Sequence, residues 1–431
     1  MEYIVFVAYL VLIAWLVTKI PFFTKTGLSR PQLVIIFLLK IMAGIFYGWI
    51  GLYYGGLAQM QDTWAYHTYG VQEYHLLFNN PQEYFTNLFH DPYGSGMSKF
   101  LSTSDSYWND LKGNLFVKIL SVFDILSFGY YYVNVIFYAF ITLFGPVAIY
   151  RVMTDIFPGK KWIILVSTFM VPSFLYWTSG IHKEGIIFTG IGLVIYALYF
   201  GHKEKKFGFR RICMLLTGLL LILFLRNFLI LIILPAVFTL LLAYRWPKRG
   251  LAIFGSMYLL FILIFFNARY INPKLDFPQA VVNRQQDFIK LVGNSTIPID
   301  ALKPTAASFL QNTPQAINLS AIRPYPGDVK HLLSLAAAIE INVLLLLFIL
   351  FIFKRKNGYH DKNIIYFCIF FSFTVLLAIG FSVNNLGAIV RYRSIILPLL
   401  VIPMVARIDW EAISRFFSSN IKKNNNLQKS T

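Results

Sequence analysis

Charged residues are scarce in this sequence, and acids are the scarcer kind. Asp, Glu, Lys and Arg make up 13% of the 431 residues, with 19 acids against 38 bases. Hydrophobic residues make up 57%, and the mean hydropathy is +0.62. A soluble domain usually has about 25% charged residues. Because the apolar runs are continuous and do not alternate, the sequence predicts an all-α polytopic membrane protein.

Two further absences narrow the function. The two cysteines, Cys213 and Cys368, lie inside apolar runs, so we expect no disulfide framework and no cysteine-based metal site. The sequence contains no Gly-x-x-x-x-Gly-Lys-[Ser/Thr] loop and no Gly-x-Gly-x-x-Gly unit. ATP-driven transport and dinucleotide chemistry are therefore not expected, and no soluble domain is present to hold a nucleotide sugar.

About eleven apolar runs approach the length of roughly 17–25 residues that a membrane span requires. They cover residues 3–19, 32–55, 131–150, 162–177, 185–201, 212–226, 228–244, 250–267, 332–353, 363–381 and 392–407. The runs 212–226 and 228–244 are predicted to be two short helices that meet near Arg226. Residues 1–19 carry Glu2 instead of a basic start, so this run is predicted to be a retained span and not a cleaved signal.

Charge predicts the orientation of these spans. If successive spans cross the membrane in alternating directions, six connecting or terminal segments lie on one side and carry +18 of the formal net charge of +19. They are residues 19–31, 151–161, 202–211, 245–249, 354–362 and 407–431. The positive-inside rule places this side in the cytoplasm, which gives the basic residues a role other than binding nucleic acid. We expect one transmembrane domain, residues 1–407, and a basic cytoplasmic tail, residues 408–431, with the composition favouring a bacterial inner membrane.

The opposite side receives two long segments, about 56–130 and 268–331, and the short loops 178–184 and 382–391. Residues 111–128 form an amphipathic pattern, which predicts a helix that lies in the membrane interface. Short amphipathic helices are therefore expected in the long extracytoplasmic loops.

The stretch from Trp177 to Gly185 places His182, Lys183 and Glu184 between two apolar runs. Ionisable residues in such a place are costly in hydrocarbon, so they usually face a cavity and have a function. His182 and Lys183 could neutralise a phosphate, while Glu184 suits the start of the next helix. The alternative is a short loop in water, in which Lys183 pairs only with Glu184.

Asp62 follows the second apolar run, five residues before His67. An acid just outside the membrane could act as a general base or bind a cation. It could equally be the N-cap of a helix. A divalent cation held by Asp62, His67, Asp91 or His90 also stays open, because carboxylate and imidazole groups are suitable ligands.

Three arginines lie where the topology does not favour them. Arg226 is set inside a long apolar stretch, which requires a partner or a wet cavity unless the side chain reaches the interface. Arg391 and Arg393 flank Tyr392 on the side that should have few basic residues. Guanidinium groups bind phosphate with two parallel hydrogen bonds, which gives these arginines a function. Anchoring at the interface together with Tyr392 is the alternative.

Several short motifs resemble those of the multi-spanning glycosyltransferases of the GT-C superfold, which use polyprenyl-phosphate-linked sugar donors. The matching positions are Asp62 in the first outer loop, the turn from Pro172 to Glu184, the pattern Gly218, Arg226 and Pro235, and the stretch from Arg391 to Pro398. The stretch from Arg323 to Pro326, before a span with Glu340, resembles a subgroup of bacterial membrane proteins related to these enzymes. The resemblance covers roughly residues 32–407. It departs in its additional first span and in the lack of a second acid beside Asp62, where protein mannosyltransferases carry Asp-Glu.

The resemblance implies a GT-C-like fold and a hexosyltransferase-like enzyme at the extracytoplasmic face. Asp62 would deprotonate the acceptor hydroxyl, which attacks the sugar with inversion. The donor phosphate would be bound by His182, Lys183, Arg226, Arg391 and Arg393. Supporting residues would be His67, Glu184, Tyr392, Asp91 and Arg323. The implied partners are the lipid-linked donor, a lipid, glycan or protein acceptor, and membrane lipids. The resemblance implies no definite cofactor and leaves a divalent cation open.

Two alternatives remain at this stage. The first is a glycan polymerase, ligase or oligosaccharyltransferase, which moves a preassembled glycan from a lipid pyrophosphate. The second is a lipid or glycan transporter or flippase without chemistry, for which broken or charged helices near the bilayer midplane and an internal repeat would be typical. Only Arg226 fits that second pattern.

Overall fold

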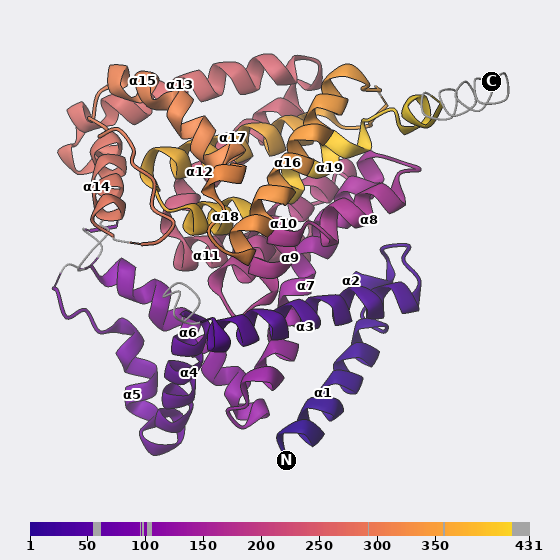
Figure 1. The fold of residues 1–431 in the computed structure, drawn as a ribbon, viewed down its shortest axis with the longest axis vertical. Coiled ribbons are helices and arrows are strands. Elements are labelled where there is room, and N and C mark those ends of the chain that lie inside the picture. Colours follow the sequence, from indigo (N-terminus) through magenta and orange to yellow (C-terminus); the bar gives the residue numbers. More distant parts are fainter. Residues whose placement is uncertain are drawn as a thin grey trace, which may run out of the picture.

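The computed structural model describes residues 1–54, 62–94, 96, 99–100, 106–291, 293–356 and 358–415. All regular elements within these ranges are helices (Figure 1). Part of the predicted outer segment 56–130, including residues 56–61, lies outside the described residues. The predicted tail 408–431 is likewise described only as far as Arg415.

Within these described ranges, seven helices are long and apolar enough to cross a membrane. They are α3 (Arg30–Tyr53), α7 (Tyr131–Ile156), α10 (Lys183–Lys203), α12 (Asn227–Arg245), α13 (Gly250–Ile271), α16 (Leu332–Phe353) and α17 (Lys362–Ser382). Two bent pairs raise the number of candidate spans to nine. They are α8 (Lys161–Phe169) with α9 (Pro172–Ser179), bent by 54°, and α18 (Leu386–Ser394) with α19 (Leu397–Ala406), bent by 63°. The prediction of an all-helical polytopic membrane protein is thus confirmed.

The predicted number of eleven spans is not confirmed. The runs 3–19 and 212–226 form α1 (Glu2–Val17) and α11 (Phe209–Leu225), which have 16 and 17 residues. A helix rises about 1.5 Å per residue, so neither reaches the thickness of about 30 Å that a hydrocarbon core has. As predicted, α11 ends beside Arg226 and α12 begins at Asn227.

The centre of the bundle is α10, which packs between α7 and α11. Glycines permit this close approach. A methyl group at Gly145 of α7 would lie 2.7 Å from the Cα atom of Thr189 on α10. A methyl at Gly190 of α10 would lie 2.8 Å from the carbonyl oxygen of Gly218 on α11, and the reverse substitution would be equally tight. Small residues at helix contacts are typical of membrane bundles, in which van der Waals packing holds the helices together.

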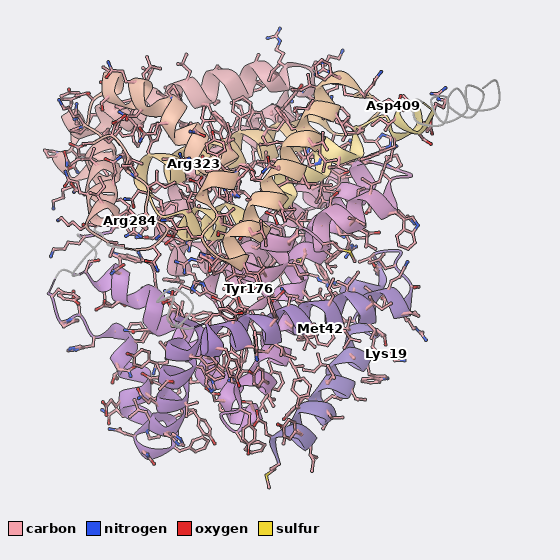
Figure 2. The ribbon with its side chains drawn as sticks, viewed as in Figure 1. Lys19, Met42, Tyr176, Arg284, Arg323 and Asp409 are labelled. Atoms are coloured by element: carbon pink, nitrogen blue, oxygen red, sulfur yellow. The ribbon has the colours of Figure 1, made fainter. Side chains whose placement is uncertain are left out.

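The two ends of the molecule match the alternation of the connections. Lys19 and Asp409, from segments predicted to be cytoplasmic, lie on the right in Figure 2. Arg284 and Arg323, from the second long outer segment, lie on the left. The short helix α2 (Pro21–Thr24) also lies on the right, whereas α5 (Pro81–Thr86) and α14 (Phe277–Lys290) lie on the left (Figure 1).

The two long outer segments contain further helices. The first includes α4 (Asp62–Asn79), α5 and α6 (Tyr107–Ser127), and the second includes α14, α15 (Ala306–Ile317) and the π-helical turn η5 (Asn318–Ile322). The helix predicted over 111–128 is present as α6. Its apolar side chains Phe116, Leu120 and Phe123 are buried, and the helix packs against α4, α7 and α11. Much of its apolar face therefore contacts protein, not the lipid interface that the sequence suggested.

Candidate functional site

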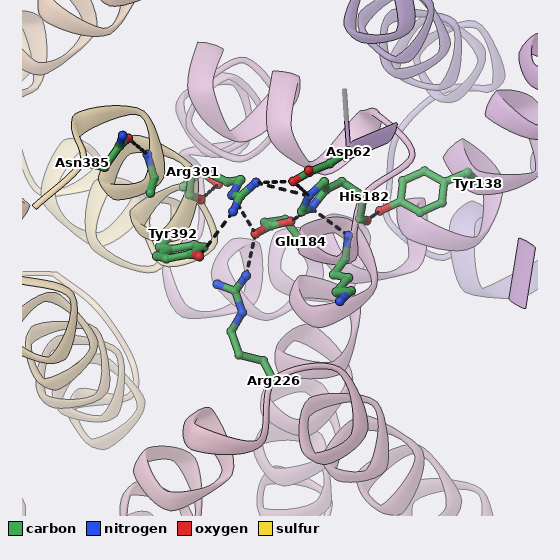
Figure 3. Close-up of polar contacts among 11 residues, drawn as sticks. Asp62, Tyr138, His182, Glu184, Arg226, Asn385, Arg391 and Tyr392 are labelled. Atoms are coloured by element: carbon green, nitrogen blue, oxygen red, sulfur yellow. Dashed lines mark hydrogen bonds and ion pairs between the residues drawn. The ribbon is translucent and has the colours of Figure 1, made fainter. Parts of the chain in front are cut away.

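Charged side chains from four distant parts of the chain meet where helices begin or break (Figure 3). Asp62 is the first residue of α4, and Glu184 lies in the first turn of α10, which His182 precedes as N-cap. Arg226 occupies the junction between α11 and α12, and Arg391 lies on α18. Helix ends expose unpaired backbone groups, so a site built from them needs polar side chains.

The turn between α9 and α10 is held from one side by α3. The ammonium group of Lys40 donates to the carbonyl oxygen of Thr178 at 2.7 Å and to Oγ of Ser179 at 3.3 Å. A cation at the last carbonyls of a helix suits the negative end of its dipole. Gly180 lies directly against the ring of Tyr47, where a Cβ atom would clash. These contacts fix where His182 and Glu184 stand.

Asp62 contacts two partners from other helices. Its Oδ2 atom accepts a hydrogen bond from a terminal nitrogen of Arg391 at 3.2 Å. The same oxygen lies 3.5 Å from Nε2 of His182. The Asp62 side chain is 43% exposed, whereas those of Arg391 and His182 are 15% and 4% exposed. Asp62 therefore stands at the accessible rim of a largely buried group.

Glu184 is the buried centre of the network. Its side chain is fully buried, and Oε1 accepts from Arg226 at 2.7 Å and lies 3.7 Å from Nε of Arg391. Its Oε2 atom contacts Nδ1 of His182. The imidazole thus lies between the two carboxylates, and Arg391 contacts both of them. A fully buried carboxylate is tolerable only with such partners.

Aromatic rings line the cations. The guanidinium of Arg226 lies 4.3 Å from the ring centroid of Tyr392, and that of Arg391 lies 5.1 Å from the same ring. The ammonium of Lys183 lies 5.1 Å from the ring of Tyr66. Cation–π contacts of this kind hold a charge in place without neutralising it.

The pKa of Asp62 lies below its usual value. Burial alone would raise this pKa, but the hydrogen bonds and positive charges of His182 and Arg391 outweigh burial. Asp62 is therefore a carboxylate at neutral pH, and its basicity depends on what Arg391 contacts.

Arg393, also predicted to bind phosphate, does not join this group. Its side chain is buried, and one terminal nitrogen donates to the carbonyl oxygens of Arg323 at 2.5 Å and Ser320 at 3.3 Å. Residues two positions apart on a helix point to nearly opposite sides. Arg393 therefore binds the chain around η5, while Arg391 faces Asp62.

Three residues predicted to support the site take part in local contacts instead. His67 lies edge-on to the ring of Tyr131, and burial lowers its pKa to about 4. Asp91 accepts backbone N–H bonds from Tyr93 at 3.1 Å and from Gly96 at 2.6 Å. Arg323 lies 3.6 Å from Asp328. These contacts do not involve Asp62 or Glu184.

Sequence patterns did not single out four residues beside the site. Tyr66 and Lys40 contact the turn that carries His182 and Lys183, and Lys112 and Arg284 add positive charge near Arg226. For Lys40, the available signal was an ionisable residue inside an apolar run. Lys112 and Arg284 lie on amphipathic helices, where a basic residue is ordinary.

Within the described part of the chain, no group of three or more His, Cys, Asp or Glu side chains is placed to hold a metal ion. Comparison with protein-family models, with curated proteins and with solved structures gives no match.

Proposed function

We propose that this protein is a membrane glycosyltransferase, which moves a sugar from a polyprenyl-phosphate-linked donor to an acceptor hydroxyl at the extracytoplasmic boundary with inversion. The observation that carries the proposal is the contact between Asp62 and Arg391, which are 329 positions apart. It brings a potential base at the start of α4 and a potential phosphate ligand on α18 together. The sugar and the lipid carrier are supported by the motif resemblance.

The acceptor reaction needs a base at the accessible rim of the site, and Asp62 stands there. The acceptor oxygen would attack the anomeric carbon while its proton passes to Asp62. In the free protein Arg391 and His182 lower the pKa of Asp62, which weakens it as a base. A donor phosphate that draws Arg391 away would raise that pKa. Donor binding would thus activate the base.

The departing group takes the electron pair of the bond to the anomeric carbon and leaves as a phosphate. Arg391 and Arg226 are held in place by Glu184, at 3.7 Å and 2.7 Å, and by the ring of Tyr392. Preorganised cations at a developing oxyanion are worth about 3–4 kcal/mol per donor. Glu184 would therefore act as a positioning residue, because its carboxylate orients both guanidinium groups.

The proposal is tested by reconstituting the purified protein in liposomes with radiolabelled polyprenyl-phosphate sugars and following transfer. Asp62→Asn should lower the transfer rate by about 10²–10⁴-fold, the range for loss of a general base. Asp91→Asn is the matched control, since Asp91 lies in the same outer segment and binds its own turn. Full turnover by Asp62→Asn would reject the role of Asp62.

The size of the product separates single-sugar transfer from block transfer. Products that grow by one sugar per turnover support the first proposal. Products that grow by whole repeat units support a polymerase, ligase or oligosaccharyltransferase, which uses a lipid pyrophosphate.

A further inference from the structure

Three cations beside the acid–guanidinium network have no carboxylate partner among the described residues. Asp62 and Glu184 form ion pairs with Arg391 and Arg226, so these four charges balance. Lys112, Lys183 and Arg284 form no such pair within the described chain, and all three side chains are only partly exposed. Uncompensated positive charge that is half-buried is costly, which indicates that an anion binds there.

The packing of α6 places Lys112 beside the network. Lys112 lies between Trp108 and Phe116, one turn away in each direction, so the three share a face of α6. Phe116 contacts Tyr66 at 5.0 Å between ring centroids, and Tyr66 holds Lys183. Trp108 contacts Phe100, whose carbonyl oxygen accepts a hydrogen bond from Asn227, the neighbour of Arg226. The face of α6 that carries Lys112 therefore packs, through Phe116 and Trp108, toward both Lys183 and the neighbour of Arg226.

Arg284 reaches the same place from α14. Its guanidinium lies 4.8 Å from the ring centroid of Phe288, and Phe288 contacts Tyr392 edge-on at 6.5 Å. Arg226 lies against the same Tyr392 ring. Burial, together with the charges of Arg284, Lys183 and Arg226, lowers the pKa of Lys112 to about 8. The three cations thus converge from α6, α10 and α14.

The number of unpaired cations bears on the charge of the ligand. A sugar monophosphate ester of a lipid has one negative charge and leaves two on the lipid phosphate when the sugar departs. A sugar diphosphate ester of a lipid has two negative charges. When the sugar departs, it leaves three on the lipid diphosphate near pH 7, because the last phosphate proton dissociates with a pKa of about 6. Three unpaired cations match the departing diphosphate.

We propose that Lys112, Lys183 and Arg284 form a second phosphate subsite beside Arg391 and Arg226, so that the donor lipid is joined to its sugar through a diphosphate. This inference rests on the proposed function and specifies its donor class. In the transfer, the bond between the anomeric carbon and the proximal phosphate oxygen breaks, the sugar goes to the acceptor oxygen, and the lipid diphosphate keeps the electron pair. The acceptor proton goes to Asp62.

Binding measurements test the subsite without turnover. The purified full-length protein in detergent is titrated with farnesyl diphosphate and farnesyl monophosphate, with inorganic pyrophosphate and orthophosphate as competitors. The wild type should bind the diphosphate lipid about tenfold or more tightly, because a hydrogen bond to a charged group is worth about 1.5–3 kcal/mol. Pyrophosphate should compete and orthophosphate should not, which would assign recognition to the headgroup and not to the tail.

The double variant Lys112→Gln with Arg284→Gln should remove this preference. Lys112→Arg with Arg284→Lys keeps both charges and should retain it, which separates loss of charge from misfolding. The control is Lys274→Gln with Lys290→Gln, two exposed lysines of the outer segment that carries Arg284. Equal binding of the two farnesyl lipids by the wild type, or an unchanged preference in the glutamine variant, would overturn the subsite.

The same experiments separate this inference from the proposed function. If the protein transfers sugar only from monophosphate donors, the transferase stands and the second subsite falls. If the diphosphate preference is present and no donor supports transfer, the subsite stands and the transferase falls.

Discussion

Arg391 and Arg393 lie two residues apart on α18, yet they belong to different regions of the molecule. Arg391 faces the ends of α4 and α10, where it contacts the Asp62 carboxylate at 3.2 Å and lies near His182 and Glu184. Arg393 points into the protein and donates to backbone carbonyls of residues 320 and 323. The first arginine has partners that a ligand could replace. The second has partners that hold the fold.

The comparison extends to the carboxylates. Asp62 is 43% exposed at the rim, so a substrate can reach it. Glu340 on α16 is 6% exposed and accepts hydrogen bonds from the backbone N–H of Ser173 at 2.5 Å and from its hydroxyl at 2.6 Å. Glu340 thereby accepts hydrogen bonds from polar groups in the first turn of α9, where backbone N–H groups have no partner within the helix. Pro172 begins that helix. Charged residues within a membrane bundle therefore either form an accessible site or bind buried backbone groups. Their contacts distinguish these two roles, whereas composition does not.

The largest difference is expected when each arginine is replaced by lysine. Arg391→Lys keeps the charge but loses the fork that contacts Asp62 and Glu184 together. The transfer rate should fall by about 10²–10³-fold, the range for loss of one preorganised donor, and the melting temperature should change little. Transfer assays and thermal unfolding in detergent measure both. A normal rate with a lowered melting temperature would assign Arg391 to the fold.

Arg393→Lys should show the opposite behaviour. A lysine can reach the carbonyls of residues 320 and 323 less well, which leaves buried acceptors unsatisfied. The free energy of unfolding should fall by about 1–3 kcal/mol. The rate per folded molecule should remain close to that of the wild type. A fall in rate without loss of stability would place Arg393 in the reaction after all.

The smallest effect is expected from pH. Because the pKa of Lys112 is lowered to about 8, this residue loses its charge as the pH rises from 7 to 9, whereas an ordinary lysine would keep it. The affinity for farnesyl diphosphate should therefore fall by up to about tenfold over this interval. Lys112→Arg stays charged, so its affinity should fall less than that of the wild type over the same interval. A wild-type affinity that does not change with pH would exclude Lys112 from the diphosphate subsite.

Much of this arrangement could be predicted from the sequence. Length and hydropathy identify the long helices, and membrane energetics single out Asp62, Glu184, Arg226 and Arg391, which the structure brings together. The sequence analysis did not resolve the direction in which neighbouring side chains point. It placed Arg391 and Arg393 in one site, although the helical period of 3.6 residues separates them.

Other parts could not be predicted, because only tertiary packing decides them. Lys112 and Arg284 look like ordinary basic residues of amphipathic helices until α6 packs against α4 and α11 and α14 lies beside Tyr392. The predicted span count is not confirmed for α1 and α11, because apolar length in a sequence does not fix where a helix ends. Their 16 and 17 residues become evident only in the structure.

The central claim is that Asp62 and Arg391 act as one unit in sugar transfer. It is tested most directly by the transfer rates of the wild type, Asp62→Asn, Arg391→Lys and the double variant in the same liposomes. Residues that act together are not additive, so the double variant should be about as slow as Asp62→Asn alone. Absence of transfer by the wild type with every lipid-linked donor, or losses that simply multiply in the double variant, would contradict the account.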